Sequence, residues 1–257
     1  MKGEYIMKVL LCIDDTDNLE SIGTGEVLEN LCSELENTFK IQTSFVSRHQ
    51  LYIHEDIAYT SHNSSMCSEL ELEKSKFDEI LDYSKAYLTN ASAQGSDPGL
   101  CMVSFEGFEG IDELVAFGKK AKKEVLNKSD AYDLAKRYSD HIFLSEHGGT
   151  GDGVIGALAG CGLRNWGMDG KIKGKIKPDN PAEILSVKQF CSKYHIHQVL
   201  DATFKEVASE DLVLSGAEIK AILWNHQPAV VVVPNDDLVS KWKIMNKKEL
   251  KKYKIGQ

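Results

Sequence analysis

A short apolar run that ends abruptly in three carboxylates constrains this chain more than any other feature. Residues 8–17 read Lys-Val-Leu-Leu-Cys-Ile-Asp-Asp-Thr-Asp, which predicts a buried strand followed by Asp14, Asp15 and Asp17. Three carboxylates within four residues repel one another strongly unless a cation lies between them. Because α/β sheets bind ligands beyond the carboxyl ends of strands, the cluster favours a magnesium site that holds a polyphosphate. A solvated acidic turn is the alternative, since Asp is common in turns.

The rest of the chain shows helical and strand patterns in alternation, which predicts a mixed α/β (α+β) fold. The 257 residues are enough for one large domain or for two domains of ordinary size. We place the boundary between two domains in the polar stretch 127–130. The expected elements are a helix at 26–38, strands near 41–47 and 51–59, a polar stretch at 60–69, a helix at 72–89, a strand at 100–105, helices at 110–126 and 129–137, and a strand at 141–145.

A second feature is a glycine-rich segment that lies between a predicted strand and an apolar helix. Residues 147–162 include seven glycines, and Gly151, Gly153 and Gly156 match the pattern Gly-x-Gly-x-x-Gly. Glycine lets backbone amides approach a phosphate, and a helix N-terminus attracts negative charge. We therefore expect residues 149–153 to contact phosphate, whereas the glycines from Gly156 onward allow close helix packing.

These two features together resemble the archaeal isoleucine-tRNA agmatinylcytidine synthetase family. The similarity includes Ile-Asp-Asp-Thr-Asp-Asn at 13–18 with Gly23 and Thr24, and Gly-Val-Ile-Gly-Ala-Leu-Ala at 153–159. Asp-Pro-Gly at 97–99 and the strand-like Val230–Val233 followed by Pro-Asn extend it over nearly the whole chain. The resemblance implies a kinase-like domain that uses ATP, followed by a ferredoxin-like domain, here at residues 1–127 and 128–257.

The resemblance also implies roles for individual residues. Asp14, Asp15 and Asp17 would hold Mg²⁺, and Asp15 and Asp17 would take part in catalysis. Residues in segments similar to those that face the substrate in the family would contact the acceptor, and a histidine there could serve as a general base; they are His49, His62 and Asn63. Residues expected to position phosphate oxygens of ATP are Thr16, Thr24, Gly149, Thr150, Gly151 and Gly153.

The chain departs from the family where the family contacts tRNA. We expect no OB-fold or zinc ribbon after the second domain. The loop that is rich in Lys and Arg in the family reads Thr-Ser-His-Asn-Ser at 60–64, and Asp152 replaces a basic residue. A lysine-rich tail at 241–257, with seven lysines and one glutamate, carries +6 of the formal net charge of −9, which leaves −15 on residues 1–240. We therefore expect poor tRNA binding, with weak, salt-sensitive association through the tail.

The composition excludes several other classes of protein. No apolar run approaches the ~20 residues that a membrane span needs, and no signal peptide is visible, so we expect a cytoplasmic protein. The six cysteines form no Cys-x-x-Cys pair, which argues against a zinc ribbon or a disulfide framework.

The sequence thus predicts a magnesium- and ATP-dependent enzyme for phosphoryl or nucleotidyl transfer. Its acceptor would be a small polar molecule or an RNA, and the residues do not choose between them. Two alternatives stay open: a non-enzymatic nucleotide-binding or regulatory protein of the same fold, and a metal-dependent phosphatase. The second follows from Asp15-Thr16-Asp17 after an apolar strand, although Leu19 departs from the usual phosphatase motif.

Overall fold

The structure, a computed structural model, describes residues 5–57, 62–236 and 239–250. The chain divides into two compact units, Met1–Trp166 and Gly167–Gln257. The division differs from the expected boundary at 127/128. Asn127 is instead the N-cap of a helix within the first unit, because its side chain accepts a hydrogen bond from the amide of Asp130. Polar clusters of this kind mark helix starts as well as linkers.

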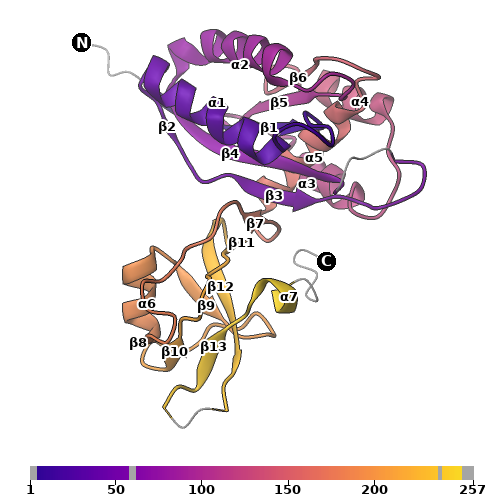
Figure 1. Cartoon of the computed structure of the whole chain (residues 1–257). Helices are drawn as coiled ribbons and strands as arrows, with labels where there is room; N and C mark the ends of the chain where they lie inside the picture. The colour runs from indigo at the N-terminus through magenta and orange to yellow at the C-terminus, as the bar shows by residue number, and fades with distance from the viewer. Residues whose placement is uncertain (1–4, 58–61, 237–238, 251–257) are drawn as a thin grey trace. The chain divides into compact units, whose positions relative to one another are not determined.

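The first unit is built on an antiparallel sheet with the strand order β6-β5-β1-β4-β3, and β2 also pairs with β4 (Figure 1). The strand β1 lies in the middle, with β4 on one side and β5 on the other. The strands are β1 (Ile6–Asp14), β2 (Gln42–Thr43), β3 (Ser47–Gln50), β4 (Ser64–Glu73), β5 (Gly99–Ser104) and β6 (Ile142–Glu146).

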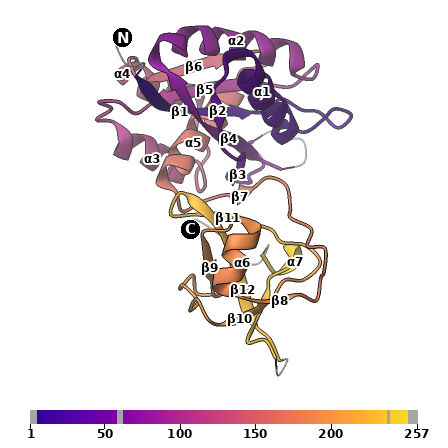
Figure 2. The same cartoon turned by 90° about the vertical axis from the view of Figure 1, so that its left-hand side faces the viewer.

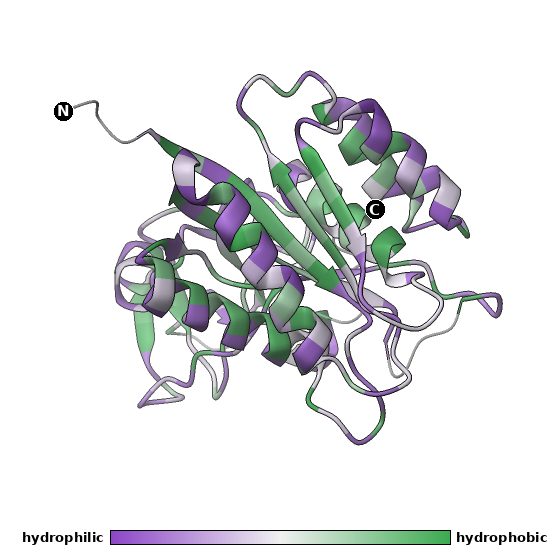
Figure 3. Cartoon of the chain, turned by 90° about the horizontal axis from the view of Figure 1, so that it is seen from above, coloured by the Kyte–Doolittle hydropathy of each residue, from purple (hydrophilic) through white to green (hydrophobic). Residues whose placement is uncertain are grey.

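Helices cover both faces of this sheet, and each face has its own hydrophobic core. The helices are α1 (Thr24–Phe39), the short 3₁₀ helix η1 (Lys74–Lys76), α2 (Phe77–Ala91), α3 (Ile111–Lys120), α4 (Lys128–Arg137) and α5 (Gly153–Trp166). The first core joins α1 and α2 to one face, and the second joins α3, α4 and α5 to the other. Hydrophobic and hydrophilic residues alternate along the helices seen from above in Figure 3, as expected for helices that cover a sheet.

The predicted strand in residues 8–17 is confirmed as β1. Val9, Leu11 and Ile13 point into the first core, and Leu10 and Cys12 point into the second. A strand that is buried on both faces has no need for alternating polar residues, which explains the continuous apolar run. The strand ends at Asp14, so the acidic residues follow directly at its carboxyl end.

The prediction for residues 51–69 is wrong in part. The third strand ends at Gln50, and residues 51–57 form no strand, while residues 58–61 lie outside the described part of the chain. The long strand β4 begins within the stretch predicted to be polar and continues to Glu73, inside the segment predicted as a helix; it pairs with both β1 and β3. Ser64, Ser65 and Ser68 are buried there. Small polar side chains fit inside a central strand, but they give no apolar alternation that a sequence pattern could detect.

The second unit contains short strands in the order β7-β11-β12-β13-β10-β8, and β9 pairs in parallel with β12 (Figure 2). Two helices, one of them a single turn, accompany the described strands. Its elements are β7 (Lys171–Ile172), β8 (Ile184–Ser186), α6 (Val187–Tyr194), β9 (Gln198–Leu200), β10 (Leu212–Leu214), β11 (Ile222–Trp224), β12 (Gln227–Pro234), β13 (Trp242–Ile244) and α7 (Lys247–Leu250).

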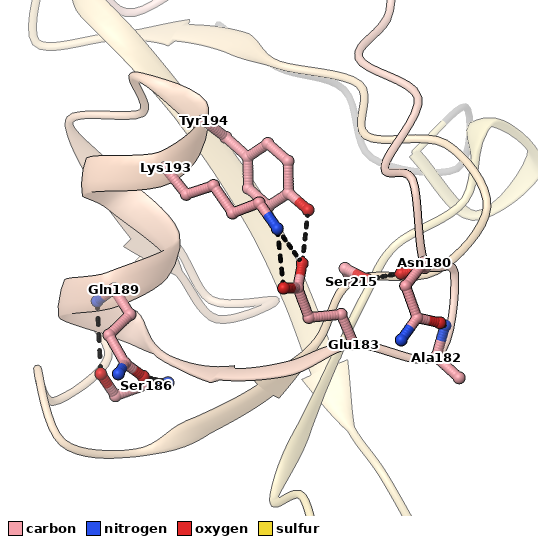
Figure 4. Close-up of polar contacts among 8 residues, drawn as sticks. All are labelled: Asn180, Ala182, Glu183, Ser186, Gln189, Lys193, Tyr194 and Ser215. Atoms are coloured by element: carbon pink, nitrogen blue, oxygen red, sulfur yellow. Dashed lines mark hydrogen bonds and ion pairs between the residues drawn. The ribbon is translucent and has the colours of Figure 1, made fainter.

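Glu183 ties the start of β8 to the helix α6 (Figure 4). Its carboxylate accepts hydrogen bonds from Lys193 Nζ at 2.7 Å and from the Tyr194 hydroxyl at 2.8 Å. The helix itself begins with a capping box, in which Ser186 and Gln189 bond each other's backbone amides. These contacts hold the helix against its own sheet.

The mixed α/β architecture that the sequence predicts is confirmed. The descriptions kinase-like and ferredoxin-like for the two parts of the chain stay predictions. Among the described residues, no helix is both long and apolar enough to cross a membrane.

Candidate active site

The acidic cluster lies where β1 leaves the sheet, between two buried strands. Asp14 is only 8% exposed, and its Oδ1 accepts a hydrogen bond from the Asp15 amide at 2.9 Å. Asp15 has a φ of 51°, in the left-handed region that Asp tolerates better than most residues. The chain therefore turns sharply after the strand, and the carboxyl groups stay together at one edge of the sheet.

The helix α1 starts beside this turn and is linked to it by hydroxyl groups. Thr24, its first residue, donates a hydrogen bond from Oγ1 to Asp17 Oδ1 at 2.8 Å. The same Oγ1 accepts hydrogen bonds from the amide and hydroxyl of Thr16, at 3.3 and 3.1 Å. Thr16 is 1% exposed, so its role here is to position Thr24. The network fixes Asp17 near the positive end of the helix.

The helix α5 approaches the acidic turn so closely that positions 153 and 156 must be glycine. A Cβ on Gly156 would lie 1.6 Å from Asp14 Oδ2, and a Cβ on Gly153 would lie 2.1 Å from the Asp97 carbonyl oxygen. The Gly153 amide donates to that carbonyl at 3.1 Å. Gly156 therefore does permit close packing, as the sequence predicts, and the group that it packs against is the Asp14 carboxylate.

The loop before α5 packs on carboxylates in the same way. The Thr150 amide donates a hydrogen bond to Asp97 Oδ1. Gly149 and Gly151 have φ angles of 57° and 79°, and a Cβ on Gly151 would lie 1.9 Å from Glu146 Oε2. The amides at 150 and 153 are thus already bonded to Asp97, which leaves fewer donors for a phosphate than the glycine pattern suggests.

A cavity of about 510 Å³ opens at this edge of the first unit, and it is strongly acidic. Its only lysine among the described lining residues is Lys128, whose Nζ lies 3.4 Å from the Glu146 carboxylate. His62 and Asn63 line the cavity from the segment before β4. The carboxylates that line it are Asp14, Asp15, Asp17, Asp56, Asp97, Glu124 and Asp152.

Burial and mutual repulsion raise the pKa values of two of these carboxyl groups. Burial, followed by the charge of Asp15, raises the pKa of Asp14 to about 8. Burial, followed by the charge of Asp97, raises the pKa of Asp15 to about 6. Such shifts are typical of carboxylates crowded together without a cation, and a bound cation would favour the ionised forms. The donors are all oxygen atoms, which fit a hard divalent ion such as Mg²⁺.

The structure brings together most of the residues that the sequence predicts for the site. Those that line the cavity are Asp14, Asp15, Asp17, Thr24, His62, Asn63 and Gly153. The others do not: Thr16 lies beneath Thr24, and Gly149, Thr150 and Gly151 pack on Asp97 and Glu146 outside the lining.

His49 is placed differently from the prediction. It is 0% exposed, and its Nε2 shares a hydrogen bond of 2.8 Å with Ser47 Oγ on the same strand. It is not among the residues that line the cavity, so it does not face an acceptor there. Because β3 pairs with β4, the alternation along the strand turns this side chain into the protein interior.

The sequence interpretation missed Asp97 as a site residue. Asp97 precedes β5, whose first residue Gly99 pairs with Asp14 across the sheet. The available signal was an Asp directly before Pro-Gly and an apolar strand. Only the pairing of β5 with β1 shows that Asp97 and Asp14 lie at the same edge of the sheet. Other lining carboxylates, such as Asp56 and Glu124, come from segments without a recognisable motif.

Comparison with known proteins gives matches among solved structures alone. No family model matches the chain, and no curated protein matches it. A crystal structure of TiaS in complex with an isoleucine tRNA and ATP is similar over 74% of this chain and 45% of that chain, with a TM-score of 0.53 and 22% identity. A complex of TiaS with the tRNA, AMPCPP and agmatine gives a TM-score of 0.53 with 21% identity over 73% of this chain and 45% of that chain.

Apo TiaS, described as an isoleucine-tRNA agmatidine synthetase, gives a TM-score of 0.52 with 20% identity over 74% of this chain and 44% of that chain. The present chain therefore spans less than half the length of the structures that it matches. At these identities, the similarity shows that this chain shares the fold of the corresponding part of TiaS.

Proposed function

We propose that this chain is a magnesium-dependent enzyme that uses ATP for phosphoryl or nucleotidyl transfer. The observation that carries this proposal is the convergence of Asp14, Asp15, Asp17, Asp97 and Asp152 around one cavity. Carboxylates in this number at the end of a central strand suit the Mg²⁺ ions that accompany a nucleoside triphosphate. The shared fold supports the proposal, because the TiaS structures include complexes with ATP and with AMPCPP.

In this proposal the acidic turn holds the metal. Asp14, Asp15 and Asp17 would provide carboxylate oxygens, directly or through water. Bound Mg²⁺ would neutralise the charge that develops on phosphate oxygens during transfer. Thr24 would keep Asp17 oriented through its hydrogen bond, and the close approach of Gly156 would keep Asp14 at the cavity wall.

The acceptor would lie at the part of the lining that His62 and Asn63 form. The Asn63 side chain donates to the Tyr52 carbonyl oxygen at 2.6 Å, which holds this segment against its neighbour. His62 would act as a general base or contact the phosphate. Since carboxylates outnumber the one lining lysine among the described residues, a cationic amine suits the cavity better than an anionic acceptor. A TiaS structure of similar fold contains agmatine, which is a cationic amine.

The proposal is tested by measuring ATP turnover by the purified chain with and without Mg²⁺. Products separated as ADP or AMP, in the presence of agmatine, other amines or tRNA, would identify the reaction and the acceptor class. We expect Asp17→Asn to reduce turnover by about 100-fold or more, because a ligand to the metal is lost. Asp82→Asn is a matched control, since Asp82 lies on the surface of α2 with its side chain 77% exposed.

The same assay separates the proposal from a non-enzymatic nucleotide-binding protein and from a phosphatase. Binding of Mg-ATP without turnover under any acceptor would favour the binding protein. Release of inorganic phosphate from simple phosphate esters, with no dependence on an acceptor, would favour the phosphatase. Either result would replace the transferase assignment.

A further inference from the structure

Three cysteine side chains meet inside the first unit, on the face of the sheet that α5 covers. They come from three elements: Cys12 from β1, Cys67 from β4 and Cys161 from α5. Their Sγ atoms all lie within 4.8 Å of one another, and all three residues are 0% exposed. Cys12 and Cys67 are direct cross-strand partners. The sequence separates these residues widely, so only the fold brings the thiols together.

A glycine brings the helix backbone against this group of thiols. A Cβ on Gly160 would lie 2.3 Å from Cys12 Sγ and 2.5 Å from Ser65 Oγ. The Ser65 hydroxyl is buried and has no hydrogen-bond partner among the described residues. A buried hydroxyl without a partner costs free energy, so its position beside the Cys12 thiol points to an additional group at this place.

A buried positive charge lies next to the thiols along the helix. Arg164 is one turn after Cys161 on α5 and is 6% exposed, so the two side chains share a face of the helix. Its guanidinium stacks on the Phe45 ring at 4.2 Å, and its Nη2 donates to Ser44 Oγ at 3.0 Å. Its Nη1 has no hydrogen-bond partner in the described part of the chain. A cation in this position compensates for negative charge on neighbouring thiolates.

We propose that Cys12, Cys67 and Cys161 form a buried binding site for a thiophilic d¹⁰ metal ion, with Cu(I) as the preferred ion. Thiolates select soft ions, and three sulfur ligands match the trigonal coordination that Cu(I) accepts. Zn²⁺ usually requires a fourth ligand. With metal–sulfur bonds of about 2.3 Å, trigonal ligands lie about 4 Å apart, so the three thiols need to move little from their present positions. Mg²⁺ prefers oxygen ligands and would stay with the acidic cavity.

The test uses the full chain, purified in reduced and metal-free form. The protein is equilibrated with Cu(I) against a chromophoric chelator, both in the native state and during refolding from denaturant. We expect one Cu(I) per chain, with three sulfur neighbours in the X-ray absorption spectrum. C161S should weaken Cu(I) binding on the order of 100-fold or more, because one of three ligands is removed.

C32S is the matched control for the loss of a buried thiol. Cys32 is 5% exposed and lies in the core on the other face of the sheet, so its loss should leave Cu(I) binding unchanged. Circular dichroism of both variants checks that each one folds. A measurement on the wild-type chain avoids variants altogether: in mild denaturant, Cu(I) should slow alkylation of residues 12, 67 and 161 relative to Cys32, as followed by mass spectrometry.

The proposal is overturned if the refolded wild-type chain takes no Cu(I) from the chelator. It is also overturned if C161S, correctly folded, binds as tightly as the wild type, or if Cu(I) protects Cys32 as well as the three thiols. These outcomes are independent of ATP turnover, so the thiol site and the proposed transferase can fail separately.

Discussion

The raised pKa of Asp14 predicts that the first unit becomes less stable as the pH rises, and that Asp14→Asn removes this dependence. In the unfolded chain the carboxyl group has its ordinary pKa of 3.8, whereas in the folded chain the value is about 8. Between these values the folded state holds a proton that the unfolded state has released. The contribution of this carboxyl group to the free energy of unfolding is therefore fully present below about pH 4, and it is lost progressively as the pH approaches 8.

Comparison of the wild type with Asp14→Asn between pH 6 and pH 8 separates this group from others that titrate there, such as His147, whose pKa is lowered by its burial and by the charge of Lys85. The pKa of Asp15 is raised to about 6, so most of its contribution is already lost at the lower end of the interval. One group that keeps its proton over two pH units contributes about 2–3 kcal/mol across them, at 1.36 kcal/mol per pKa unit. For a unit of this size, that corresponds to a decrease in Tm of roughly 5–10 °C.

Asn has the shape of Asp and can still accept the Asp15 amide, but it does not titrate. Asp14→Asn lacks this titration, so its stability relative to the wild type should rise by about 2 kcal/mol between pH 6 and pH 8. Urea unfolding with EDTA, followed by Trp166 fluorescence, is a suitable assay. Trp166 ends α5 in the first unit, and the other two tryptophans, Trp224 and Trp242, are replaced by Phe in all variants.

Added Mg²⁺ should restore the stability of the wild type at pH 8, because the ion binds the ionised carboxylates, and should have a much smaller effect on Asp14→Asn. Asp82→Asn should retain the wild-type pH dependence. An Asp14→Asn variant whose stability changes between pH 6 and pH 8 with the same slope as that of the wild type would refute the electrostatic reasoning.

Three further predictions concern the glycines and the tail. Gly156→Ala places a Cβ 1.6 Å from Asp14 Oδ2, so we expect a loss of about 1–3 kcal/mol in urea unfolding and no stabilisation by Mg²⁺. Gly151→Ala forces Ala to a φ of 79° beside Glu146 and should lower the free energy of unfolding by about 1 kcal/mol or more. Unchanged Mg-ATP affinity in calorimetry would show that this loop does not position phosphate. Deletion of 251–257 should weaken tRNA association in low-salt gel shifts, because three of the seven tail lysines are lost, and should leave ATP turnover intact. Tight binding at physiological salt that survives the deletion would restore an RNA acceptor.

The structure limits how much of the lysine-rich tail can be removed in such an experiment. The segment from residue 241 includes β13, which pairs with β12 and β10. Lys241 forms an ion pair with Asp211 at 2.8 Å, and Met245 is buried. Deleting the chain from residue 241 would therefore disrupt the second unit, whereas the deletion from residue 251 spares these described contacts.

The sequence by itself determined the features that depend on local pattern. The continuous apolar run Val9–Ile13 indicated a buried strand, and the amphipathic spacing after Gly23 indicated α1. The same pattern placed the acidic cluster at the end of that strand, with Asp14, Asp15 and Asp17. These features are encoded within about ten neighbouring residues, so periodicity and turn chemistry are sufficient to find them.

Tertiary structure alone decided which distant residues join the site and which leave it. Asp97 reaches the acidic turn because β5 pairs with β1, and His49 is excluded because β3 turns it into the interior. The buried serines of β4 and the thiols of Cys12, Cys67 and Cys161 likewise meet only through strand pairing and the packing of α5. Contacts between residues far apart in the chain depend on strand order and register, which a one-dimensional pattern does not specify.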